Sequence, residues 1–168
     1  MFMRTYFRSL VAAAAVTAAV VTGGIATAAP AAAAPREKPI PGIALYGNNF
    51  GTFGDHDFCR GTVNYRFTSP KRGIARLTLT SNGFTGNGSG WKKNPTCRVL
   101  FIATQISPAS LYRETFIPAA FGSKPGQKIT RDLRTGSGLA EVGVASYASN
   151  SPVRVLQGAL AVSYLTVP

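Results

Sequence analysis

The sequence predicts an all-β protein, an antiparallel β-sandwich of seven or eight short strands with one disulfide. Three observations lead to this fold class. Beyond the N-terminal 28 residues, no segment keeps the 3.6-residue apolar period of a helix. Glycine and proline interrupt the chain at short intervals, as they do between short strands. Cys59 and Cys97 are the only cysteines and can form one bond. A small β-barrel is the alternative arrangement of the same strands.

The N-terminus, residues 1–28, has the pattern of a secretory signal peptide. Two arginines precede an apolar run, Leu10–Val21, and small residues follow it, with a cleavage site after Ala28 and a second candidate after Ala34. The run is shorter than the roughly 20 residues of a membrane-spanning helix, although an uncleaved anchor is the alternative. We therefore expect a secreted protein, extracellular or associated with the cell wall, with no transmembrane segment once the peptide is removed.

The rest of the chain is predicted to hold one folded unit. Residues 29–42 are rich in alanine and proline and are expected to form a mobile lead-in, and residues 43–168 a single β-domain. We expect its strands within Ile43–Phe58 and over Gly61–Phe67, Ile74–Ser81, Cys97–Ile106, Leu111–Ile117, Lys128–Arg134, Leu139–Ala148 and Val153–Val167.

Two of these strands should pair as a hairpin. Gly61–Phe67 and Ile74–Ser81 each alternate apolar and polar residues, which predicts strands with one buried face. The segment between them, Ser69–Gly73, has the composition of a turn and carries two basic residues. Next, Asn82–Asn94 is predicted to be a long glycine-rich loop.

The remaining strands differ in character. Cys97–Ile106 is apolar on both faces and is predicted to be a central strand. Leu111–Ile117 is expected to end at Pro118, and Val153–Val167 is the longest run of residues that favour strands.

The cysteine pair is predicted to be a disulfide, because the chain has an export signal. The pair and the single histidine cannot supply a four-ligand zinc site. Closing the segment from Cys59 to Cys97 should stabilise the fold by roughly 4 kcal/mol.

The layout resembles small secreted β-sandwich proteins of high-GC Gram-positive bacteria. The alanine-rich export signal, Cys59 and Cys97, the NGFTGNGSGW segment and the ending from Tyr164 to Pro168 carry the resemblance. It implies a secreted β-sandwich and brings no catalytic residues with it.

Several groups of residues have the types found in metal or catalytic sites. His56 lies between Asp55 and Asp57, a set that could bind a divalent metal, although a polar loop explains it equally well. Glu114 and Glu141 could meet as a glycosidase pair, but their spacing does not require it. A ribonuclease reading of Glu114 fails because no histidine follows it. Ser89–Lys92 matches S-x-x-K without its partner motifs. The sequence therefore predicts no catalytic residue, no metal site and no cofactor, and favours a protein that is not an enzyme.

Positive charge is the main functional signal, since 18 basic residues face six acidic ones. The predicted hairpin carries the candidate contacts for a polyanion: Arg66, Lys71, Arg72 and Arg76. The loop before Cys97 carries a second set of candidate contacts: Trp91, Lys92 and Lys93. Trp91 could stack on a sugar, but packing in the core near the disulfide is favoured.

The leading hypothesis is a secreted, cationic, disulfide-bonded, non-enzymatic module that binds a ligand or associates with the cell envelope, with an anionic envelope polymer or an extracellular protein as its expected partner. An inhibitor of an extracellular enzyme, presenting Asn82–Asn94 to that protein, is the alternative, and a small hydrolase is a third. Nucleic acid is not expected, because no recognition motif or aromatic platform accompanies the charge.

Overall fold

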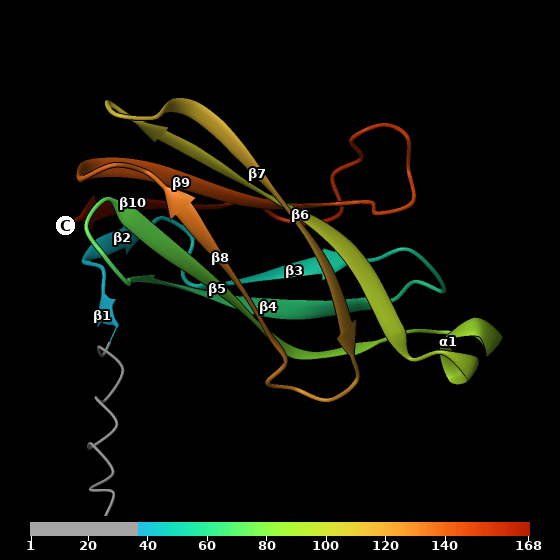
Figure 1. Cartoon of the computed structure of the whole chain (residues 1–168). Coiled ribbons are helices and arrows are strands. Elements are labelled where there is room, and N and C mark those ends of the chain that lie inside the picture. Colours follow the sequence, from blue (N-terminus) through green and yellow to red (C-terminus); the bar gives the residue numbers. More distant parts are fainter. Residues whose placement is uncertain (1–36) are drawn as a thin grey trace, which may run out of the picture. The chain divides into compact units, whose positions relative to one another are not determined.

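The computed structural model describes residues 37–168, which form two antiparallel sheets packed face to face (Figure 1). The first sheet has the order β1-β4-β5-β8, with β3 also paired to β4, and the second has the order β2-β10-β9-β6-β7. The elements are β1 (Lys38–Pro39), β2 (Gly42–Ala44), β3 (Asn49–Phe53), β4 (Arg60–Ser69), β5 (Ile74–Thr85), α1 (Ser89–Lys93), β6 (Thr96–Ser107), β7 (Leu111–Gly122), β8 (Lys128–Arg134), β9 (Gly138–Tyr147) and β10 (Ala161–Val167).

The antiparallel sandwich with one disulfide is confirmed, and the barrel alternative is wrong because the two sheets do not close on each other. Ten strands form in the described residues, where seven or eight were predicted. The difference comes mainly from β1 and β2, which are two and three residues long. Such short strands leave no alternating pattern for sequence analysis to detect.

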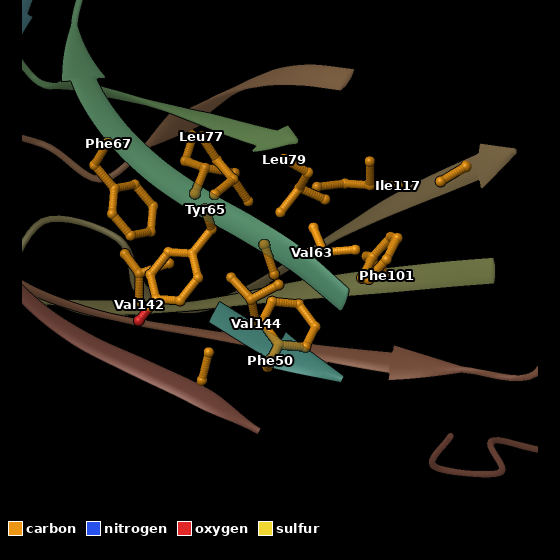
Figure 2. Close-up of a cluster of buried hydrophobic side chains, with 14 of the residues drawn as sticks. Phe50, Val63, Tyr65, Phe67, Leu77, Leu79, Phe101, Ile117, Val142 and Val144 are labelled. Carbon is orange, nitrogen blue, oxygen red and sulfur yellow. The ribbon is translucent and has the colours of Figure 1, made fainter. Parts of the chain in front are cut away.

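The core lies between the sheets. On β4 the residues Val63, Tyr65 and Phe67 are buried, and on β5 Leu77 and Leu79 are buried, as their alternation predicted. Figure 2 shows these side chains meeting those of the second sheet. β6 pairs with both β7 and β9, which confirms a central strand.

Pro118 does not end its strand, contrary to the prediction. β7 continues to Gly122, and Pro118 pairs in register with Leu100 of β6. β7 is an edge strand of the second sheet. Proline is tolerated there because an edge strand has a row of backbone groups with no partner in the sheet.

The run Val153–Val167 is only partly a strand, since β10 covers Ala161–Val167. The preceding segment forms a loop that is held by a bidentate ion pair, in which the Arg154 guanidinium donates to Glu114 on β7 at 2.8 Å twice. The same guanidinium carbon lies 5.2 Å from the centre of the Phe116 ring. A β-favouring composition therefore also fits a loop that is tied to the sheet by a specific pair.

The ordered domain begins earlier than residue 43. Lys38–Pro39 pair with β4, and Ile40 is buried in the core, so the end of the predicted lead-in belongs to the sandwich. The predicted signal peptide, residues 1–28, and the rest of the lead-in lie outside the described residues. Within residues 37–168, no helix has both the length and the apolarity needed to cross a membrane. The disulfide is compatible with an extracellular protein.

Candidate functional site

The outer face of the first sheet is polar and basic. Strand register places its outward side chains in rows, in which Asn64 pairs with Thr80 and Thr80 with Lys128, and in the next row Arg66 pairs with Thr78. These positions alternate with the buried residues of β4 and β5, so their side chains are on the solvent side.

A hollow of about 470 Å³ lies on this face. Its lining consists of hydroxyl, amide and cationic side chains: Asn64, Arg66, Thr68, Thr78, Thr80, Asn82 and Lys128. The lining contains no carboxylate. Within the described residues, neither Arg66 nor Lys128 takes part in an ion pair. The two cations are therefore available to an external anion.

The four predicted polyanion contacts divide into three groups. Arg66 lies in the hollow. Arg76 shares the outer face, but its guanidinium is paired with Asp132 at 2.5 Å and with Glu37. These hydrogen bonds raise the pKa of Arg76, and the one to Asp132 has the larger effect. Lys71 and Arg72 are exposed at the hairpin tip, where Arg72 donates to the Ser137 hydroxyl at 3.4 Å. The charge of Arg76 is thus already compensated.

Sequence reasoning did not select Lys128 as a contact. It lies on β8, far along the chain from β4, and reaches the hollow because β8 pairs with β5. The strand order is a long-range property, and no local signal in the sequence assigns it.

A second hollow continues along the same face. It has a volume of about 730 Å³ and shares Asn82 with the first hollow. Four glycines contribute to its lining, Gly51, Gly61, Gly83 and Gly158, beside Phe53, Phe84 and Arg60. A side chain at Gly51 would meet no atom closer than the Gly61 carbonyl oxygen at 4.0 Å. The absence of that side chain helps to keep the hollow open.

A third hollow of about 650 Å³ lies at the disulfide end and shares Phe53 with the second. Its other lining residues are Gly54, Asp55, His56, Asp57, Phe58, Asn87 and Gln157. Asp55 and His56 also line a smaller hollow of about 380 Å³ with Asn94 and Arg98. The Asp-His-Asp triplet is thus in a concave region of the surface.

Asp55 is the buried anchor of this region. Its carboxylate accepts from His56 Nδ1 at 2.9 Å, from Arg98 Nε at 2.6 Å and from the Arg98 backbone N–H at 2.9 Å. Burial alone raises the pKa of Asp55, but the hydrogen bonds from His56 and Arg98 outweigh it and lower the pKa to about 2. The carboxylate is therefore ionised at all physiological pH values.

His56 is held between two acceptors. Its Nδ1 faces Asp55, and its Nε2 lies 3.4 Å from the Asn94 carbonyl oxygen. The hydrogen bond to Asp55 raises the pKa of His56, burial opposes this, and the Asn94 carbonyl adds to the rise. Two acceptors favour the imidazolium, which donates from both nitrogens. This arrangement suits a structural cation better than a general base, which needs a free nitrogen.

The next turn holds two residues with left-handed backbone angles. Asp57 and Phe58 both have φ of 49°, and the Cys59 N–H donates to the His56 carbonyl at 2.8 Å, as in a type I′ turn. One Asp57 carboxylate oxygen is buried without a hydrogen-bond partner. Phe58 projects from the turn with 78% of its surface exposed.

The triplet does not come together as a metal site. Both Asp55 oxygens accept hydrogen bonds from His56 and Arg98. Asp55, Cys59 and Cys97 do place ligand-type atoms within 4.8 Å of one another, but the two sulfurs are joined in the disulfide. Cysteine binds a metal as the thiolate, so the oxidised pair offers a metal no sulfur ligand.

The predicted loop contacts lie on α1, a short helix that was expected to be part of a loop. Trp91 is half-buried against the core, and its ring centre is 6.1 Å from that of His56. Lys92 and Lys93 are exposed. The preceding residues up to Thr85 extend β5, so Asn82–Asn94 is not one long loop.

The two hydrolase candidates, Glu114 and Glu141, lie on β7 and β9 with β6 between them. Glu114 binds Arg154 and accepts from the Tyr112 hydroxyl at 2.7 Å. Glu141 binds the Tyr164 hydroxyl and raises its pKa. Both carboxylates are thus engaged in local structure.

Comparison with known proteins adds no further assignment. No family model, no curated protein and no solved structure matches this chain. The resemblance to small secreted β-sandwich proteins stays a prediction from the sequence.

Proposed function

We propose that this chain is an exported, non-enzymatic binding module that takes up an anionic polymer of the cell envelope on the outer face of the first sheet. The observation that supports the proposal is the hollow around Arg66 and Lys128. Two uncompensated cations lie there among hydroxyl and amide groups, with no carboxylate in the lining.

The chemistry of the hollow fits a polymer that carries both anions and hydroxyl groups. Arginine and lysine bind phosphate or carboxylate groups, and arginine can do so with two parallel hydrogen bonds. Threonine hydroxyls and asparagine amides both donate and accept, so they suit neutral hydroxyl groups between the charges. The high net charge, +12 for the full sequence, would speed the encounter with a polyanion.

Retention on immobilised polygalacturonate and on immobilised poly-L-glutamate tests the proposal. The parent should be retained above physiological ionic strength. Arg66→Gln with Lys128→Gln should elute at clearly lower salt from both columns. The matched control, Lys71→Gln with Arg72→Gln, removes the same charge from the hairpin tip and should change elution less. Equal loss in both double variants would show that net charge, and not the hollow, determines retention.

An inhibitor of an extracellular enzyme is the alternative function from the sequence. The segment proposed to contact that enzyme contains the end of β5 and α1, with Trp91 packed on the core. Lys92 and Lys93 remain exposed, so a pull-down with Lys92→Gln and Lys93→Gln as the comparison variant would test it. The hydrolase alternative has less support, because neither hollow that contains His56 is lined by a serine or free cysteine among the described residues.

A further inference from the structure

The third hollow differs in character from the basic hollow. Two phenylalanines, Phe53 and Phe58, line it and expose 46% and 78% of their surface. Asn87, Gln157 and Asp57 also line this hollow. Exposed apolar faces beside convergent polar groups are typical of ligand sites.

Phe58 is an unusual residue for its backbone angle. Non-glycine residues with positive φ are mostly asparagine and aspartate, and a bulky residue there is an outlier. Its neighbours hold the turn in place, because the Gly54 N–H donates to the Cys59 carbonyl at 2.8 Å and Cys59 is fixed by the disulfide. Backbone strain of this kind is concentrated at ligand sites, where the surrounding structure maintains it. Here the strained turn directs an aromatic ring outward.

The first two hollows lie along β5, and the third lies beyond the end of this strand. The first is lined by Thr78, Thr80 and Asn82, the second by Asn82 and Thr85, and the third by Asn87. The stretch of β5 from Thr78 to Thr85 spans about 23 Å at the usual rise per residue. The trough formed by these three hollows is therefore long enough for several units of an extended polymer.

We propose that the polymer bound in this trough is an acidic polysaccharide, and that Phe58 and Phe53 hold one of its sugar rings at the disulfide end. This proposal rests on the proposed function. The apolar face of a sugar ring packs on an aromatic side chain, while its hydroxyl groups bind polar residues such as Asn87 and Gln157 in the same hollow. Arg66 and Lys128 at the other end bind the acidic substituents. A polyanion without sugar rings can use only the basic end.

The test compares two polyanions by titration calorimetry, an oligogalacturonate and a poly-L-glutamate of similar length and charge. The key variant is Phe58→Asn, because asparagine accepts positive φ and so removes the ring without added backbone strain. Tyr46→Asn is the matched control, since Tyr46 is another exposed aromatic residue in a turn and lies outside the trough. Circular dichroism and thermal unfolding should show that both variants are folded.

We expect Phe58→Asn to weaken oligogalacturonate binding by about tenfold or more and to leave poly-L-glutamate binding unchanged. Tyr46→Asn should change neither. If the parent binds both polymers equally and Phe58→Asn alters neither affinity, or alters both alike, the sugar assignment is wrong while the basic hollow stands. If the parent binds neither polymer, the proposed function itself fails.

Discussion

Removal of the disulfide should cost much of the stability of this domain. Cys59 directly precedes β4 of the first sheet, and Cys97 lies on β6 of the second, so the bond links the two sheets. Both residues are fully buried. The sequence separation is 38 residues, for which the chain-entropy relation gives about 4 kcal/mol. Because the free energy of unfolding of a single domain is roughly 5–15 kcal/mol, this loss is a large part of the total stability.

The variant for this test is Cys59→Ala with Cys97→Ala, which avoids two buried thiols. Urea unfolding with linear extrapolation, on the parent and the double variant, measures the difference in the free energy of unfolding. The oxidised parent should also show no titratable thiol after denaturation. A difference below about 1 kcal/mol would refute the reasoning, because the cross-link would then not constrain the unfolded chain.

Four further predictions concern single residues. Asp55 has a pKa of about 2 against an ordinary 3.8. Its ionised form should therefore add roughly 2 kcal/mol to the free energy of unfolding above pH 4, and this contribution should be lost as the pH falls towards 2. In the variant Asp55→Asn, the free energy of unfolding measured in urea should depend less on pH in that range. The pKa of His56 is raised in the folded protein, so His56 should stabilise the fold below pH 6.5, and this stabilisation should be lost as the pH rises through its folded pKa. An NMR titration of His56, together with the free energy of unfolding at each pH, measures this. Gly51→Val should leave thermal stability nearly unchanged, because valine suits a strand and an added Cβ meets no atom closer than the Gly61 carbonyl oxygen at 4.0 Å, but it should narrow the trough and weaken oligogalacturonate binding in calorimetry. Arg154→Met should speed limited proteolysis of the loop before β10, because Glu114 would no longer hold that loop.

The local parts of the fold could be predicted from the sequence. Alternation identified β4 and β5 with their buried residues, and the apolar run around Phe101 identified the central strand β6. Those signals are local, because burial on one face gives a period of two. Pro118 misled the prediction, because the ban on proline in strands applies to central strands and the sequence does not show which strand is at an edge.

The site was harder to predict because it depends on long-range pairing. Arg76 was grouped with Arg66 from their common outward face, which is correct, but the partners that neutralise Arg76 come from the predicted lead-in and from β8. Lys128 reaches the hollow through the same pairing of β8 with β5. Strand order decides which charges are compensated, and alternation within one strand carries no information about it.

The turn at Phe58 shows how tertiary contacts override local preference. A type I′ turn is normally predicted from Asn-Gly or Asp-Gly, and Asp57-Phe58 has only the first half of that signal. The conformation is fixed instead by the disulfide, by the hydrogen bond from the Arg98 side chain to the Asp55 carboxylate, and by the contact between the His56 ring and the Asn94 carbonyl oxygen. Glycine or asparagine at position 58 would adopt the same backbone with less strain, so the backbone alone does not account for a phenylalanine there. The ring is also mostly exposed, so it adds little to the core. What the phenylalanine supplies at that position is an apolar face directed to solvent at the disulfide end of the trough, and this is the property on which the sugar-binding proposal depends.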